Sequence, residues 1–190
     1  MRKLIVSMNV TLDGFMSGPD CELDWHFEAW SADMARELSA QLQATDTILL
    51  GRITYQAMAH YWPSRSQDLS FPREDLAFAE MMNKHRKIVF SKTLDEASWN
   101  NTIVCRGSVI AKIRELKQQP GRDIIVYGSG QLVNKLMADN LIDVYTLWLH
   151  PVAIGKGKPL FKKLRRRISV SAQSVTQFSS GVLALSYHSR

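Results

Sequence analysis

The sequence predicts an α/β fold in which helices cover both faces of a mostly parallel β-sheet. Over most of the chain, short apolar segments rich in valine and isoleucine alternate with segments of helical periodicity. From residue 143 onward the pattern changes to successive strands without helices, which indicates antiparallel strands at one edge of the sheet. With 190 residues, 45% of them hydrophobic, the chain suits a single domain spanning 1–190 with a sizeable core.

The first strand is expected over residues 2–10, where a short apolar run contains branched side chains. A long loop follows over residues 11–25, because two glycines, a proline and scattered acids interrupt any periodicity. The same apolar, branched pattern predicts further strands at 46–50, 87–91 and 101–105, and another that begins at Asp123.

Helices are predicted between these strands. Residues 28–43 place apolar side chains at helical spacing at Trp30, Met34, Leu38 and Leu42. Further helices are expected within 51–58, over 74–84, from Ser108 to about Gln119, and after Gly130, with an irregular connection at 61–73. The C-terminal strands are expected at 143–154, 167–177 and 181–189, the last two forming a hairpin.

The charge and cysteine content exclude several classes of function. The net charge is +6, and much of the excess lies in the run KPLFKKLRRR at 158–167, which lacks interleaved aromatic residues, so we expect no nucleic-acid partner. No apolar run approaches a membrane span and no leader pattern is evident, so a cytoplasmic protein without a membrane partner is expected. Cys21 and Cys105 stand in no metal-ligand spacing, and no metal is expected.

Three strand ends carry residues that suit phosphate groups. Gly51-Arg52-Ile53-Thr54 combines a glycine, a guanidinium and a hydroxyl at a helix start. Gly128-Ser129-Gly130 leaves backbone N–H groups at the start of a helix, and Ser91-Lys92 adds a hydroxyl and an ammonium. Together these residues favour a dinucleotide, and the two cations indicate NADP rather than NAD. The alternative is that the glycines only permit tight turns.

In this order, the motifs SMNVTLDGFMSG, LLGRITYQAM, IVFSKTL, IIVYGSGQLVNKL and HPVAIGKGKPLF resemble the dihydrofolate reductase-like superfamily. They are most similar to the C-terminal reductase domain of bifunctional riboflavin-biosynthesis deaminase-reductases. The resemblance implies a three-layer α/β/α fold with about eight strands, NADPH as cofactor, and a homodimer. It assigns the cofactor to Val10, Gly14, Phe15, Met16, Gly51, Arg52, Thr54, Ser91, Lys92, Gly128, Ser129, Gly130, Gln131 and Leu132.

The substrate side is predicted from the loop after the first strand. In the riboflavin-pathway branch the motif Leu-Asp-Gly corresponds to Leu12, Asp13 and Gly14, which makes Asp13 the candidate catalytic residue, as hydrogen-bond acceptor or proton relay. The alternative is a simple turn. Asp24 and Trp25 are candidate substrate-binding residues, although Trp25 also suits a core position.

The predicted function is an NADPH-dependent reductase that transfers hydride to a small pyrimidine- or pterin-like substrate. It resembles 5-amino-6-(5-phosphoribosylamino)uracil reductase. Dihydrofolate reduction is less favoured, because no one of Asp24, Glu28 and Asp33 can be assigned as the carboxylate that the pterin needs. The alternative is a non-catalytic nucleotide- or ligand-binding protein of the same fold.

Overall fold

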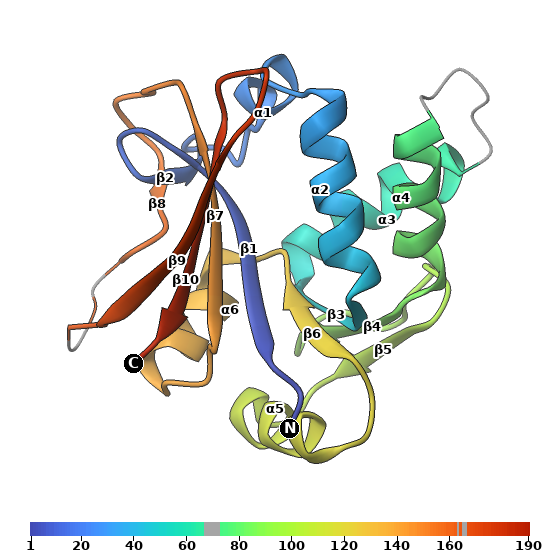
Figure 1. Ribbon diagram of the computed structural model, residues 1–190. Coiled ribbons are helices and arrows are strands. Elements are labelled where there is room, and N and C mark those ends of the chain that lie inside the picture. The colour runs from blue at the N-terminus through green and yellow to red at the C-terminus, as the bar shows by residue number, and fades with distance from the viewer. Residues whose placement is uncertain (67–72, 163, 165–166) are drawn as a thin grey trace.

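An eight-stranded mixed sheet forms the centre of the molecule (Figure 1). The computed structural model describes residues 1–66, 73–162, 164 and 167–190. The strands of the main sheet are β1 (Leu4–Thr11), β3 (Thr45–Gly51), β4 (Arg86–Phe90), β5 (Thr102–Cys105), β6 (Asp123–Val126), β7 (Val144–His150), β9 (Val170–Gln177) and β10 (Leu183–Ser189). Their spatial order is β5-β4-β3-β6-β1-β7-β10-β9.

The strand directions confirm the predicted fold class. All neighbours from β5 to β7 are parallel, whereas β10 runs antiparallel to both β7 and β9. β1 lies between β6 and β7, with Leu4 opposite Ile124 and Ile5 opposite Val144. A second, two-stranded sheet pairs β2 (Phe15–Ser17) with β8 (Lys158–Pro159).

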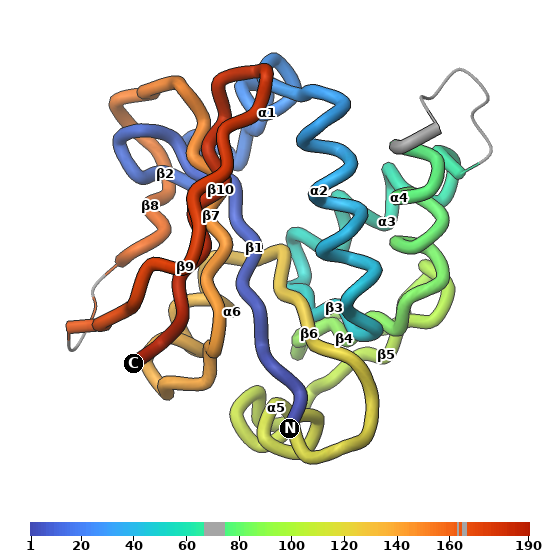
Figure 2. The backbone as a smooth tube through the Cα atoms, in the orientation of Figure 1, coloured from blue at the N-terminus to red at the C-terminus, as the bar shows by residue number. Residues whose placement is uncertain are grey.

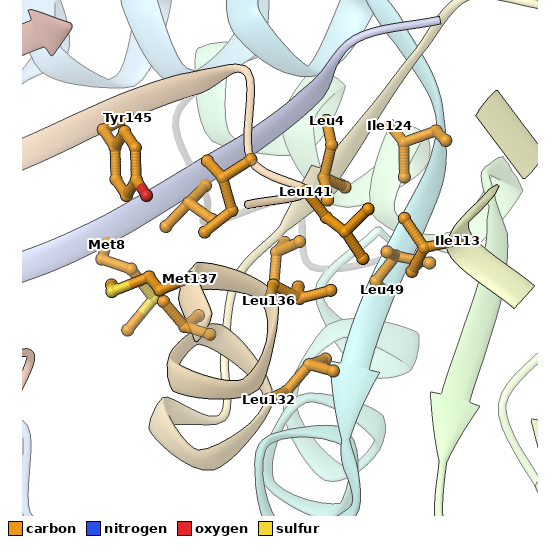
Figure 3. Packing of buried hydrophobic residues seen from close by; sticks show 14 of the residues in the cluster. Leu4, Met8, Leu49, Ile113, Ile124, Leu132, Leu136, Met137, Leu141 and Tyr145 are labelled. Carbon is orange, nitrogen blue, oxygen red and sulfur yellow. The ribbon is translucent and has the colours of Figure 1, made fainter. Parts of the chain in front are cut away.

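Helices cover both faces of the main sheet. On one face lie α2 (Ala32–Gln43), α3 (Arg52–Arg65) and α4 (Arg73–Lys84), and on the other lie α5 (Val109–Gln118) and α6 (Gly130–Ala138). Alternation along β1 sends Leu4, Val6 and Met8 toward α5 and α6, where Figure 3 shows Leu4 and Met8 among side chains of α6 such as Leu136. The parallel strands are therefore covered on both faces, as is typical of them, whereas the edge strand β9 is largely exposed.

The N-terminal part departs from the prediction in one respect. The expected helix over 28–43 is two helices, the short α1 (Asp24–Glu28) and α2, since Ser31 has extended backbone angles (φ −144°, ψ 155°). The buried residues of α2 keep the predicted spacing at Met34, Leu38 and Leu42. The loop predicted over 11–25 also contains β2 and the start of α1.

Other boundaries differ by a few residues. α3 continues to Arg65 with Pro63 inside it, so part of the connection predicted over 61–73 is helical, and residues 67–72 lie outside the described residues. β7 ends at His150, immediately before Pro151, which cannot donate a ladder hydrogen bond. Ser108 caps α5 as predicted, its Oγ accepting from the Ala111 amide at 3.3 Å.

Lys87 on β4 is a fully buried lysine. Its ammonium donates to the backbone carbonyls of Met82 (2.7 Å), Asn83 (3.0 Å) and His85 (2.9 Å), at and just beyond the end of α4. It also lies 4.3 Å from the centre of the Trp99 ring. The charge therefore replaces a helix cap, joining the end of α4 to the sheet.

The N-terminus lies beside α5 (Figure 2), where the Arg2 amide donates to the Lys117 carbonyl at 3.2 Å. Buried Arg2 pairs with Asp46 at the start of β3.

Among the described residues, no helix has both the length and the apolar character that crossing a bilayer requires.

Candidate functional site

The carboxyl ends of the parallel strands bring the predicted cofactor residues to one edge of the sheet. Val10 lies near the end of β1, Gly51 ends β3, Ser91 follows β4 and Gly128 follows β6. β3 pairs with both β4 and β6, and β6 pairs with β1, so these four strand ends are neighbours. Ligands of open α/β sheets bind at this edge.

The Gly51 and Gly128 turns are in direct contact. The Gly51 amide donates to the Gly128 carbonyl at 3.0 Å, and the peptide bond between Gly128 and Ser129 is cis. Helix α3 begins immediately after Gly51, and α6 begins immediately after Ser129. Neither helix N-terminus has a side-chain cap, in contrast to α5. Two sets of backbone N–H groups therefore converge where an anion would be stabilised by both helix dipoles.

Both positions require glycine. A Cβ on Gly51 would lie 2.3 Å from Ser129 Oγ and 3.1 Å from the Ser129 amide nitrogen. Gly128 has a φ of +126°, and a Cβ there would approach Thr54 Oγ1 to 3.0 Å. The close approach of the two turns therefore depends on the missing side chains.

Some of the polar side chains around these turns already make hydrogen bonds within the protein, whereas others are free to bind a ligand. Arg52 donates to Gln56 Oε1 at 3.0 Å on the exposed surface of α3. Ser91 Oγ accepts from the Thr93 and Leu94 amides at 3.1 and 2.9 Å, so this hydroxyl closes a local turn. Lys92 is exposed.

Arg106, which the sequence reasoning did not select, donates to the carbonyls of Leu94 and Asp95, both at 2.9 Å. It therefore fixes the loop after β4 and adds a cation near Lys92. The signal for it is its position one residue beyond β5, equivalent to that of Ser91 after β4.

The loop after β1 reaches the start of α6. A Cβ on Gly130 would lie 2.2 Å from Met16 Cε, so the Met16 side chain rests against the first residue of that helix. Thr11 shapes this loop, since its Oγ1 accepts from the Phe15 amide at 3.0 Å. Of the predicted loop residues, Met16 thus lies beside the Gly128–Gly130 turn, whereas Phe15 pairs with Pro159 and the Gly14 carbonyl accepts from the Leu160 amide.

Asp13 fastens this loop to the segment after β7. Its Oδ1 accepts from Thr11 Oγ1 at 2.5 Å, and its Oδ2 accepts from the amides of Ile154 (3.1 Å) and Gly155 (2.7 Å). The hydrogen bond from Thr11, followed by those from the backbone, lowers the pKa of the Asp13 carboxyl. Asp13 is therefore an ionised carboxylate with both oxygens engaged.

Trp25 and His26 of α1 form a cluster with Asn9 of β1 and His150 of β7. These four residues are here called the α1 cluster. The Trp25 and His150 rings meet edge to face at 5.0 Å between centroids, and the His26 and His150 rings are 5.4 Å apart. His150 Nε2 lies 3.1 Å from Asn9 Oδ1. Asp24, also on α1, is exposed. Sequence reasoning selected Trp25 but neither His26 nor Asn9, since no local pattern joins them.

A broad hollow of about 610 Å³ lies at the opposite end of β4 and β5, beside Lys84, Arg86 and Trp99. The Trp99 indole there already donates to Asn83 Oδ1 at 2.6 Å. The chemistry predicted from the sequence is absent from that end, so we place the candidate site at the carboxyl edge.

Residues 2–184 match the RibD C-terminal domain. The chain belongs to the RibD C-terminal domain family. This match confirms the family resemblance seen in the sequence motifs, and it extends over nearly the whole chain. YyaP of Bacillus subtilis (strain 168) is 34% identical over 98% of this chain and 95% of its own length.

Solved structures agree on the fold of this RibD C-terminal domain. The diaminohydroxyphosphoribosylaminopyrimidine deaminase/5-amino-6-(5-phosphoribosylamino)uracil reductase of Thermotoga maritima superposes with a TM-score of 0.68 at 16% identity, covering 100% of this chain and 57% of that one. Dihydrofolate reductase from Enterococcus faecalis, complexed with NADP(H), superposes with a TM-score of 0.58 at 14% identity, covering 99% and 96%. The fold is dihydrofolate reductase-like, and the family supports a reductase-like role.

His26, which is partly buried, and His150, which is fully buried, make the RibD C-terminal domain sensitive to acid. Burial lowers the pKa of His26 to about 4, and burial together with the neighbouring His26 lowers the pKa of His150 to about 4. An unfolded histidine has a pKa of about 6.5. Between these values the unfolded chain binds protons that the folded chain excludes, so acid favours unfolding.

We therefore expect the free energy of unfolding to fall as the pH drops from about 6.5 to about 4, by up to about 1.4 kcal/mol per pH unit for each histidine. Urea unfolding at several pH values measures this slope. His150→Asn should make the slope shallower, and His60→Asn, on the exposed surface of α3, is the matched control. Equal slopes in the wild type and His150→Asn would contradict the prediction.

Proposed function

We propose that this RibD C-terminal domain is an NADPH-dependent reductase that transfers hydride to a small pyrimidine- or pterin-like heterocycle. The observation that carries the proposal is the convergence of two uncapped helix N-termini, α3 and α6, through the Gly51–Gly128 hydrogen bond. Such a junction suits the linked phosphates of a dinucleotide better than a single phosphate, because each helix offers its own free N–H groups.

The residues at this edge fit the proposed cofactor. The first amides of α6, at Gly130, Gln131 and Leu132, face no side-chain cap and can donate to pyrophosphate oxygens. Arg52 and Thr54 stand in the first turn of α3, where a guanidinium and a hydroxyl can bind a further phosphate. Ser91 and Lys92 are assigned to the same extra phosphate, with Lys92 the more available of the two. When bound, NADPH supplies the hydride.

The loop after β1 would hold the reacting ring. Val10 is buried near the end of β1, and Met16 rests against Gly130, beside the turn assigned to the pyrophosphate. Hydride transfer needs the two rings held in contact with water excluded, and apolar side chains meet this need. We assign Val10, Gly14, Phe15 and Met16 to this task.

The hydrogen bonds of Asp13 favour a positioning role. Because its carboxylate holds Ile154 and Gly155, it fixes the segment after β7 beside the loop after β1. The proton relay predicted for Asp13 stays a prediction, as do the substrate contacts of Asp24 and Trp25.

Titration of the purified protein with NADPH and NADH tests the proposal. Quenching of tryptophan fluorescence and energy transfer to the reduced nicotinamide report binding, and loss of the nicotinamide absorbance with pyrimidines or pteridines reports turnover. Tight NADPH binding with turnover is the expected result. Binding without turnover of any acceptor would favour a non-catalytic ligand-binding protein, and binding of neither nucleotide would refute the cofactor assignment.

Arg52→Ala is expected to weaken NADPH binding by about 1 to 3 kcal/mol and NADH binding by much less, because a charge-assisted bond to the extra phosphate is lost. The same fluorescence titrations measure both losses. Arg114→Ala, which removes an exposed arginine from α5, is the matched control. Equal losses for both nucleotides would remove Arg52 from the extra phosphate.

We also propose that the protein is a homodimer, as the family resemblance implies. Light scattering coupled to size-exclusion chromatography gives the molar mass directly, and a mass near the 21.6 kDa of one chain would contradict the proposal.

A further inference from the structure

The charges of this chain are unevenly divided between the two sides of the candidate site. Residues 4–35, from the first strand to the first turn of α2, contain six acidic side chains and no lysine or arginine. The cofactor side carries Arg52, Lys92 and Arg106 at its strand ends. A phosphate is therefore attracted to the strand ends of β3 to β5 and repelled by the segment around α1.

Several acids of this segment lie on α1 or close to it in the sequence. Asp24 and Glu28 are exposed on α1 itself, and Asp33 accepts from the Ser179 amide at 2.8 Å. Lys158 at the start of β8 donates to Cys21 Sγ at 2.5 Å, and its positive charge interacts with the carboxylates of Asp20 and Glu22.

Beside Lys158, Lys156 is exposed, and the next cation after Lys3 along the chain is Arg36 on α2. Lys158 therefore offsets part of the negative charge of Asp20 and Glu22.

Two nitrogen atoms inside the α1 cluster have no hydrogen-bond partner. They are Trp25 Nε1 and His150 Nδ1, in side chains that are 6% and 0% exposed. His150 Nε2 donates to Asn9 Oδ1, since a carbonyl oxygen only accepts, so in the neutral ring Nδ1 is the acceptor. An indole N–H donor and an imidazole acceptor thus lie on adjoining rings. Buried polar groups are rarely left without partners, so this pair indicates a ligand.

We propose that the α1 cluster binds an uncharged planar heterocycle through a lactam edge, with the ligand carbonyl accepting from Trp25 and the ligand N–H donating to His150, and that this substrate carries no phosphate. The inference rests on the proposed function, because it identifies the hydride acceptor of the same site. It distinguishes this chain from a reductase of phosphoribosyl substrates, since neutral imidazoles and carboxylates cannot balance a phosphate charge.

Access to the two nitrogens requires α1 to move, because both atoms are shielded from solvent. The helix has only five residues, lacks a side-chain cap, and buries only Trp25. Phe27 on the same helix is 60% exposed. A helix of five residues, held mainly by one buried side chain, can open locally and close again over a bound ring.

Two matched probe pairs test the inference by isothermal titration calorimetry, in the presence and absence of NADP⁺. Lumazine presents lactam edges and 1,3-dimethyllumazine has them blocked; uridine and uridine 5′-monophosphate differ only in the phosphate. We expect lumazine to bind about tenfold more tightly than its dimethyl derivative, and uridine to bind at least as tightly as its monophosphate. Tighter binding of the monophosphate, equal binding of the two lumazines, or no binding of lumazine and uridine would each overturn the proposal.

Trp25→Phe keeps the aromatic ring and removes the N–H, so it should weaken lumazine binding about tenfold and leave NADP⁺ binding unchanged. Trp30→Phe, which removes the N–H of a half-buried indole outside the α1 cluster, is the control. Unchanged lumazine affinity in Trp25→Phe would refute the assignment of the indole. Because NADP⁺ is titrated separately, failure of NADP⁺ to bind would count against the proposed function, while the lumazine comparison still judges the inference.

Discussion

Replacing Gly51 with valine should weaken NADPH binding by about 100-fold, equivalent to about 2.7 kcal/mol. The valine side chain would enter the space held by Ser129, whose Oγ and amide nitrogen lie 2.3 and 3.1 Å from the position of the new Cβ. The Gly128–Gly130 turn would have to move away from α3, separating the two helix N-termini that we assign to the cofactor phosphates. Gly51 is a better test than Gly130, whose nearest neighbour is the flexible end of Met16.

Gly107→Val is the matched control, because a Cβ at Gly107 would meet nothing within 4 Å. Nucleotide fluorescence titration gives the affinities, and circular dichroism establishes that both variants are folded. The crowded variant should also lose about 1 to 3 kcal/mol of stability, as overpacked sites do. A folded Gly51→Val protein with undiminished NADPH affinity would show that the junction of α3 and α6 does not bind the nucleotide.

Lys87→Met should destabilise the protein by about 3 to 5 kcal/mol. The methionine would fill most of the space but leave the carbonyls of Met82, Asn83 and His85 without the donor that they share. Burial lowers the pKa of Lys87 to about 8, so at neutral pH the ammonium is protonated and available to all three. The midpoint and slope of urea unfolding at neutral pH measure the loss.

Lys84→Met provides the comparison for this variant. Lys84 lies at the same end of α4 and pairs with Glu80 at 3.2 Å, but both side chains are largely exposed. Exposed pairs of this kind contribute a few tenths of a kcal/mol. Similar losses in the two variants would mean that the buried ammonium is not the group that caps α4.

The strands were predictable from the sequence because most of them are buried on both faces and appear as continuous apolar runs. The helix expected over 28–43 illustrates what local patterns miss. Trp30 continues the spacing of Met34 and Leu38, yet Ser31 adopts extended angles and separates α1 from α2. Only packing against the sheet distinguishes the two arrangements.

Some residues of the candidate site could likewise be predicted from the sequence, and others could not. Gly51 and Gly128 could be selected from the sequence, because turns from strand to helix have local requirements that name the residue type. The α1 cluster could not, since Trp25 and His150 lie 125 positions apart and their contact exists only once β1 and β7 are paired. Ser91 shows the converse: its position is as expected, but its hydroxyl already serves the Thr93 and Leu94 amides.

The position of β1 has a consequence for biosynthesis. This strand is made long before its two partners, which begin at Asp123 and Val144, with Leu4 beside Ile124 and Ile5 beside Val144. A nascent chain on the ribosome therefore carries an unpaired, largely apolar segment until more than a hundred further residues have been translated. Pairing over such a separation is slow and exposes chains to aggregation, so this protein should depend on protection by chaperones while it is being synthesised.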